Sequence, residues 1–205
     1  MTEHPHHTHH HHDLNDEDMF QRMVAILDGK EREEQLSAEG IIAYLPDLSE
    51  KTVFDGGAGT GYLTFPLANK AERVIAFDQS DRMLELIQER AEKRELNNIT
   101  TLSGDIREIP LPDNSVDLAI VSVMIHEVHP FEEALKELER IIKSDGQFVI
   151  LEFESETHQD KGGHRIPSKV MKEKLEALNF PIIKQLIPEQ GMYLFVVEKK
   201  SKLVP

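Results

Sequence analysis

The feature that most limits the fold is a glycine-rich loop placed directly between an apolar strand and a helix. The stretch "VFDGGAGTGYLT", residues 53–64, holds four glycines and an alanine behind an acidic residue. The apolar run Lys51–Asp55 predicts a short buried strand, and Gly61–Asn69 predicts a helix. Small residues at such a turn let the backbone approach a ligand closely. The loop therefore predicts a ligand site at the end of this strand.

Beyond the loop, predicted strands and helices alternate along the chain. A helix follows the N-cap Ser80, and another begins after Pro130 with apolar positions that run as far as Ile142. Asp145-Gly146 predicts a turn into the fifth strand. The alternation predicts an α/β fold with a parallel sheet. The other predicted elements are the strands Arg73–Asp78, Ile99–Leu102, Asp117–Val123, Gln147–Phe153, Ile182–Ile187 and Tyr193–Lys199 and the helix Ser168–Leu178.

The last two of these strands are separated only by a short turn around Gly191. Such a turn is too short for a helical crossover, so these strands should pair antiparallel.

Composition excludes several classes of function. The 205 residues suit one domain, and no run of 18 apolar residues predicts a membrane span. The chain has no cysteine, which excludes disulfides, thiolate nucleophiles and cysteine metal sites. A formal charge of -15 opposes binding to nucleic acid. The polar N-terminus does not resemble a secretory signal, so we expect a cytoplasmic protein.

The glycine loop fits neither of the two common phosphate-binding patterns. Both the dinucleotide fingerprint and the P-loop require another residue where Tyr62 stands. The acids Asp55, Asp78 and Asp105 instead follow the first three predicted strands. A carboxylate at the loop would repel pyrophosphate and favour an ammonium or sulfonium group. Asp78 can also accept hydrogen bonds from ribose hydroxyls, and Asp105 from an adenine amine.

At this point the chain resembles the class I S-adenosylmethionine-dependent methyltransferases, and within them the UbiE-like (methyltransferase type 11) group. The resemblance covers roughly residues 31–199. It implies a Rossmann-like seven-stranded sheet of order 3-2-1-4-5-7-6 with strand 7 antiparallel and helices on both faces. The stretches that carry it are "VFDGGAGTGYLT", "VIAFDQS", "GDIREIPLPDNSVDLAIVSVMIHEV" and "ALKELERIIKSDGQFVILEFE".

The resemblance also implies a cofactor, S-adenosyl-L-methionine, with S-adenosyl-L-homocysteine as the product. Loop residues would surround its methionine part, Asp78 its ribose, and Asp105 its adenine, while Ser122 and Val123 would lie under the sulfonium. The implied cofactor-binding residues are Asp55, Gly56, Gly57, Ala58, Gly59, Thr60, Gly61, Asp78, Gln79, Met83, Gly104, Asp105, Ile106, Ser122 and Val123.

Candidate residues for the acceptor side follow the fourth and fifth strands. His126 is the candidate catalytic base, because an imidazole titrates near neutral pH, although a histidine here can also merely pack under the next helix. Glu127 and His129 share its loop and are candidate substrate residues. His164 and Arg165, in the loop after the fifth strand, are candidates for binding an anionic acceptor; the alternative is a solvated loop in which Arg165 pairs with a neighbouring acid. Glu152, at the end of the fifth strand, lies in the same region, where the resemblance implies acceptor-side residues.

Seven of the eleven histidines lie between positions 4 and 12. Imidazole suits divalent metals, so His9, His10, His11 and His12 are a candidate metal site. An affinity tag or a plain polar tail are the alternatives. We expect residues 1–15 to form this His-rich tail and residues 16–205 to form one domain. Its first part, residues 16–50, should supply helices that cover the active site, namely Asp16–Leu27 and Leu36–Leu45.

These observations together predict direct SN2 transfer of a methyl group to a small-molecule acceptor by a monomer or homodimer, with no nucleic-acid or membrane partner. The acceptor atom stays open among O, N, S and C. One alternative is a non-catalytic protein that binds S-adenosylmethionine or, through its histidines, a metal. A nicotinamide oxidoreductase is disfavoured by Tyr62.

Overall fold

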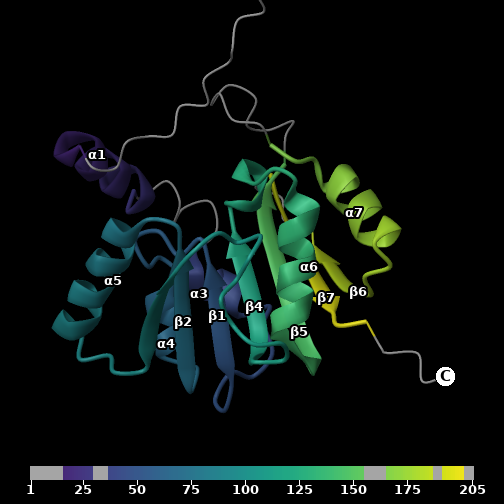
Figure 1. Ribbon diagram of the computed structural model, residues 1–205, viewed down its shortest axis with the longest axis horizontal. Helices are drawn as coiled ribbons and strands as arrows, with labels where there is room; N and C mark the ends of the chain where they lie inside the picture. The colour runs from purple at the N-terminus through teal and green to yellow at the C-terminus, as the bar shows by residue number, and fades with distance from the viewer. Residues whose placement is uncertain (1–15, 30–36, 155–164, 187–190, 201–205) are drawn as a thin grey trace, which may run out of the picture.

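The computed structural model describes residues 16–29, 37–154, 165–186 and 191–200, and its centre is one seven-stranded sheet (Figure 1). The strand order is β3-β2-β1-β4-β5-β7-β6, which confirms the predicted topology. β7 pairs antiparallel with both β5 and β6, and the other pairs are parallel. The strands are β1 (Thr52–Gly56), β2 (Arg73–Asp78), β3 (Ile99–Ser103), β4 (Val116–Ser122), β5 (Ile142–Phe153), β6 (Ile182–Leu186) and β7 (Met192–Glu198).

Helices cover both faces of the sheet because alternate strand residues point to opposite sides. Phe54 of β1 belongs to the cluster that α6 (Phe131–Ile141) and α7 (Ser168–Ala177) complete. Its neighbour Val53 belongs to the cluster under α3 (Ala38–Ile42) and α4 (Thr64–Ala68). α5 (Asp81–Lys93) packs on the α4 side, against Ala76 of β2.

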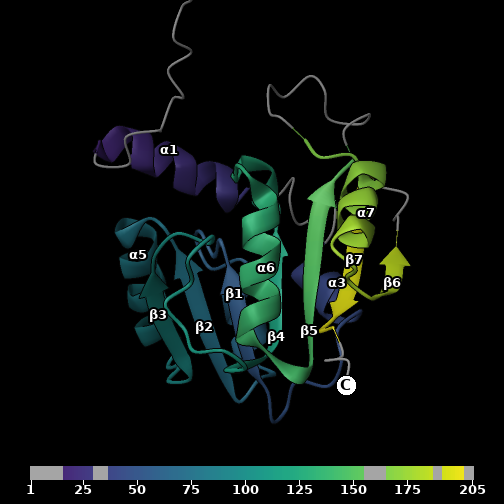
Figure 2. The same ribbon diagram turned by 45° about the vertical axis from the view of Figure 1, so that its right-hand side comes forward.

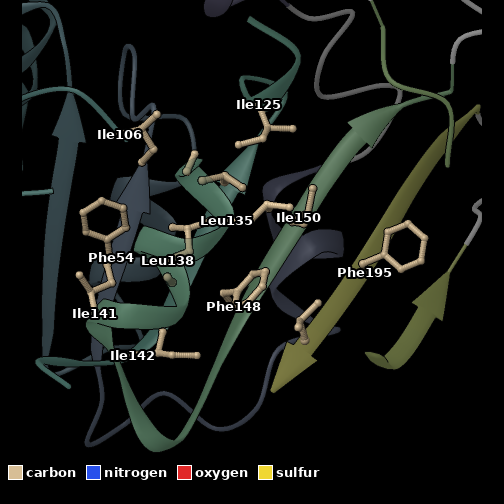
Figure 3. Packing of buried hydrophobic residues seen from close by; sticks show 14 of the residues in the cluster. Phe54, Ile106, Ile125, Leu135, Leu138, Ile141, Ile142, Phe148, Ile150 and Phe195 are labelled. Atoms are coloured by element: carbon tan, nitrogen blue, oxygen red, sulfur yellow. The ribbon is translucent and has the colours of Figure 1, made fainter. Parts of the chain in front are cut away.

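The largest cluster lies between α6 and the central strands. The helix places Leu135, Leu138 and Ile141 on one face, at the spacing that the sequence predicted, and all three are fully buried. They face Phe148 and Ile150 of β5 (Figure 3). Each such side chain contributes roughly 1.5–3 kcal/mol by leaving water. This cluster fixes β4 and β5 side by side, which matters for the site below.

Two element boundaries differ from the sequence-based expectation. The helix predicted from Gly61 begins only at Thr64, because Gly61 has a φ of 88°, which a right-handed helix does not allow. Ile142, predicted to end a helix, is the first residue of β5, where it pairs with Val116. The predicted turn at residues 145–146 lies inside this strand, at the register shift between Val116 and Leu118.

The first described helix, α1 (Glu17–Leu27), begins at Asp16, whose side chain accepts a hydrogen bond from the backbone amide of Met19 as an N-cap. This helix lies across the carboxyl ends of the parallel strands, above α5 (Figure 2). Arg90 of α5 contacts Asp28 at its end, and Arg82 pairs with Glu17 at its start. α1 is thus attached at both ends to α5.

None of the helices within the described ranges has the length and apolar character needed to cross a membrane.

Candidate functional site

The glycine loop after β1 folds over the tip of β2. The backbone amides of Gly57 and Ala58 both donate to the carbonyl of Phe77, at 2.8 and 2.9 Å. Gly57, Gly59 and Gly61 have positive φ angles of 72°, 53° and 88°, a region that residues with a Cβ rarely occupy. The loop therefore needs its glycines for its own backbone path.

Asp78, at the end of β2, anchors this loop. Its carboxylate accepts from the backbone amides of Gly59 and Ser80, both at 2.9 Å. Burial raises the pKa of Asp78, and the hydrogen bonds from Ser80, Gly59 and Gln79 offset only part of this effect. A carboxylate has about four acceptor sites. Asp78 can therefore accept hydrogen bonds from a ligand's hydroxyls while it still holds the loop.

Asp55 lies beneath the loop at the end of β1. It is buried, and its carboxylate accepts a hydrogen bond of 2.6 Å from the hydroxyl of Thr64. Because Thr64 is the first residue of α4, this bond joins the strand end to the helix that follows the loop. Asp55 and Asp78 thus lie on neighbouring parallel strands, at the same edge of the sheet.

Asp105 follows β3 at the same edge but is more exposed. Arg107 donates to both of its carboxylate oxygens, and these bonds hold the pKa of Asp105 below its ordinary value. Arg107 also donates to the carbonyl of His129 at 2.7 Å. Through Arg107, the loop after β3 is connected to the loop before α6. Ile106 beside it is buried, and Gly104 donates to the backbone carbonyl of Asp78.

The tip of β4 bends sharply after Ser122. Val123 has a φ of 55°, an unusual value for a β-branched residue that costs roughly 1–3 kcal/mol. The bend carries the next residue, Met124, over the glycine loop. A Cβ built on Gly57 would lie only 2.6 Å from Met124 Cγ, so only glycine fits at this position.

The 3₁₀ helix after this bend, η1 (Ile125–Glu127), places His126 against β5. The imidazole is only 8% exposed, and its Nδ1 lies 2.9 and 3.0 Å from the two carboxylate oxygens of Glu152. Glu152 is fully buried and also accepts a hydrogen bond from the backbone amide of His126. The candidate residues after β4 and those at the end of β5, which are distant in the sequence, are therefore in contact in the structure.

Arg165 completes this cluster. Its Nη1 lies 3.1 Å from Nε2 and 3.3 Å from Nδ1 of His126, and 3.8 Å from Glu152. These two nearly equal distances exclude a position of Nη1 in the plane of the imidazole ring. In that plane, an atom hydrogen-bonded to one nitrogen would lie much further from the other nitrogen. An in-plane position equally far from both nitrogens would overlap Cε1. The guanidinium therefore stacks on the face of the imidazole, as arginine commonly does on flat rings.

The remaining predicted residues vary in their placement. Met83 is buried on α5, and Gln79 is exposed beside Asp78. Glu127 is 71% exposed, 3.8 Å from Nε2 of His126, and His129 is exposed. His164 and the tail histidines 9–12 lie outside the described residues. Within the part of the chain that is described, no group of three or more metal-ligating side chains converges.

Sequence reasoning missed Arg107, which bridges Asp105 and His129 although nothing in its local pattern indicates a bridge. Glu152 is in the acceptor-side region that the resemblance implies, but its contact with His126 was not predicted. A signal for a partner was present, because a carboxylate inside the apolar run "FVILEF" of a buried strand requires one.

Comparison with known proteins agrees with this geometry. Residues 54–150 match a family model described as a methyltransferase domain. A demethylmenaquinone methyltransferase from Thermobifida fusca is 33% identical over 137 residues, which cover 66% of this chain and 56% of that protein. The protein YafE from Escherichia coli is 35% identical over 102 residues, covering 50% of this chain and 49% of that protein. The chain spans about half the length of these curated relatives.

Solved structures share the fold across nearly the whole chain. A methyltransferase from Aquifex aeolicus superposes with a TM-score of 0.79 at 23% identity, covering 86% of this chain and 97% of that one. A methyltransferase from Haloferax volcanii, in complex with the Trm112 activator, gives 0.77 at 20% identity, covering 90% and 97%. By motif, family match over residues 54–150 and fold, the chain is similar to class I S-adenosylmethionine-dependent methyltransferases, with UbiE-like demethylmenaquinone methyltransferases among its relatives.

Proposed function

We propose that the protein transfers a methyl group from S-adenosylmethionine to a small-molecule acceptor by direct SN2 displacement. The family match and the methyltransferase relatives support the reaction class. The small size of the acceptor is supported by two relatives that are named for a small-molecule acceptor, demethylmenaquinone.

The carboxyl edge of the sheet suits the cofactor. Asp78 has acceptor capacity left for ribose hydroxyls, and Asp55 and Asp105 stand on the flanking strand ends. The edge is thus acidic, as a cationic sulfonium nucleoside requires. When bound there, the cofactor supplies an already activated methyl group, so the protein mainly has to align the acceptor and exclude water.

The acceptor would lie near η1, where His126 takes its proton. Glu127, the last residue of this turn, and His129, just after it, are exposed and would contact the acceptor, and Arg165 lies half-buried against His126. α1 would cover the site from above, because Leu27 lies over the loop, 3.3 Å from a Cβ built on Gly59. In this proposal residues 16–50 exclude water during transfer.

The observation that carries the proposal is the position of Asp78, which holds the glycine loop and remains open to further donors. Calorimetry with S-adenosylhomocysteine and, separately, with NADH tests it directly. We expect micromolar binding of the first and none of the second. A methyl-labelled cofactor incubated with a cell metabolite extract should then label a small-molecule product. The opposite preference between the two nucleotides would overturn the proposal.

The alternative of a non-catalytic binding protein gains no support from the relatives, several of which are named as methyltransferases. It predicts tight nucleoside binding with no label transferred to any acceptor in the extract. A cytoplasmic location, a monomeric or homodimeric state and a divalent metal at His9–His12 stay predictions. Calorimetry with nickel or zinc tests the last of these, and sedimentation tests the oligomeric state.

A further inference from the structure

We infer that Glu152 is a positioning residue, which holds His126 as the neutral tautomer protonated on Nδ1 and leaves Nε2 to take a proton from the acceptor. The inference rests on the proposed function and deepens it, because it assigns the acceptor to a chemical class. A site built around a proton acceptor suits an acidic hydroxyl, such as that of a phenol or enol.

The first observation is the burial of Glu152. The run Phe148–Phe153 around it is otherwise apolar, and the carboxylate has no exposed surface. Burying a charge is costly unless it is paired and hydrogen-bonded. Here three contacts compensate: the Nδ1 group and the backbone amide of His126, and the guanidinium of Arg165. An apolar residue would serve packing at this position without any of these partners.

The second observation fixes the tautomer. An ionised carboxylate only accepts hydrogen bonds, so the ring nitrogen that lies 2.9 Å from Glu152 carries the proton. The stacked guanidinium of Arg165 occupies the face of the ring and not its edge. Among the residues that the structure describes, the in-plane lone pair of Nε2 is therefore left for a proton donor. This is the arrangement by which a carboxylate orients a catalytic imidazole in other enzymes.

The charged groups around the imidazole come from three elements. Glu127 lies on the same turn, Glu152 on β5, and Arg165 before α7. Behind Glu152, Tyr193 of β7 occupies the paired register position, and burial together with the Glu152 and Glu154 carboxylates raises its pKa. Tyr193 therefore stays neutral, and its hydroxyl donates to the carbonyl of Ile166 at 2.8 Å.

The step balances without another reagent. The acceptor's O–H bond breaks and its proton passes to Nε2 of His126. The oxygen lone pair forms the new bond to the methyl carbon, while the S–CH₃ bond breaks and its electron pair stays on sulfur. The ring, now charged, lies beside the carboxylate of Glu152, and its proton is later released to water.

The first test is long-range ¹H–¹⁵N NMR of the histidine rings in the wild-type protein near neutral pH. The signal of His126 is assigned by its loss in His126→Asn, a variant that keeps a donor toward Glu152. We expect Nδ1 to be protonated and Nε2 to be bare. A ring protonated on Nε2, or on both nitrogens, overturns the inference. This readout needs no acceptor and no substitution of Glu152.

The second test compares Glu152→Gln with Glu154→Gln. Glu154 ends the same strand, and its carboxylate accepts from the backbone amide of Ser168, a role that glutamine keeps. We expect label transfer into the metabolite extract to fall about 100-fold in Glu152→Gln and to persist in Glu154→Gln. Binding of S-adenosylhomocysteine should be unchanged in both. Wild-type transfer in Glu152→Gln overturns the inference.

The results distinguish failure of the proposed function from failure of the role assigned to Glu152. If the wild-type protein fails to bind S-adenosylhomocysteine, the proposed function falls, whatever the tautomer of His126. If it binds and transfers label but the tautomer is wrong, only the role of Glu152 falls. Should Glu152→Gln not fold, the NMR result on the wild-type protein still decides.

Discussion

The backbone amide of Gly59 donates to the carboxylate of Asp78 across 2.9 Å, so the tip of β2 fixes the loop that follows β1. The same carboxylate is the proposed partner of the cofactor ribose. Loop shape and nucleoside binding therefore depend on one side chain, and changes to it can be read in two separate measurements, ligand affinity and thermal stability.

Asp78→Asn should weaken binding of S-adenosylhomocysteine by about tenfold or more, because hydrogen bonds to a charged acceptor contribute roughly 1.5–3 kcal/mol. The melting temperature should also fall, because the amide nitrogen cannot accept the hydrogen bond that one of the two carboxylate oxygens receives from Gly59 or Ser80. Asp81→Asn is the matched control, because Asp81 is exposed at the start of α5. Calorimetry measures the affinity of both variants for S-adenosylhomocysteine. If Asp78→Asn binds as tightly as Asp81→Asn, the proposed ribose contact is wrong.

Binding should also depend on pH through Asp78. Burial holds its pKa above the ordinary 3.8, so the ionised form costs stability above that raised pKa and the cost disappears at lower pH. Ribose hydroxyls donate more strongly to the ionised form than to the protonated form. Affinity should therefore be full above the raised pKa and fall as the pH drops through it, beginning higher than 3.8. Binding titrations with S-adenosylhomocysteine at a series of pH values check this expectation. In Asp78→Asn, the affinity should no longer change with pH in this way.

Gly61→Ala should destabilise the fold more than Gly59→Ala. Both residues have positive φ, which costs alanine about 1 kcal/mol. A Cβ on Gly61 would also lie 2.3 Å from the ring of Phe65, whereas one on Gly59 meets only Leu27 at 3.3 Å. In urea unfolding, the free energy of unfolding of Gly61→Ala should be lower than that of Gly59→Ala by roughly 1–3 kcal/mol. The reverse order would show that the loop relaxes around Phe65.

Arg90→Gln should loosen α1. Arg90 pairs with Asp28 at 2.6 Å and donates to the carbonyl of Thr60 at 2.9 Å, so it joins the helix to the glycine loop. Burial opposes the charged form of Asp28, but hydrogen bonds to its carboxylate, chiefly from Arg90, together with the charges of Arg90 and Arg94 outweigh this effect, so the pKa of Asp28 is lowered. Amides of α1 should exchange faster in hydrogen-exchange experiments, and S-adenosylhomocysteine should dissociate faster. Lys93→Gln, a substitution of an exposed residue on the same helix, should leave both rates unchanged.

Local sequence signals predicted the sheet well because its central strands contain buried apolar runs. The bounds of β2 were predicted to the residue, and Ser80 caps α5 as expected. The tight turn at Gly191 correctly indicated the antiparallel β6–β7 pair. Errors arose where tertiary contacts outweigh periodicity: Ile142 continues the apolar stripe of α6, yet its pairing with Val116 makes it a strand residue.

The site could be predicted only where it depends on residues close in sequence. The acids at the ends of β1, β2 and β3 follow from strand and loop order alone. The contact of His126 with Glu152 joins positions 26 apart, and it exists because β4 and β5 pair in a particular register and Val123 bends the chain. The stacking of Arg165 is still more remote from any local pattern, since it requires the return from β5 to α7.

The two parts of the site at the carboxyl edge of the sheet come from two successive parts of the sequence. Everything proposed to hold the nucleoside, apart from the floor at Ser122 and Val123, is encoded between Asp55 and Ile106, whereas the imidazole and its partners come from His126 onward. Mutation in the later half can therefore retune the choice of acceptor while cofactor recognition is inherited intact. A laboratory selection for new acceptors should accumulate its changes after β4 and spare the first three strands.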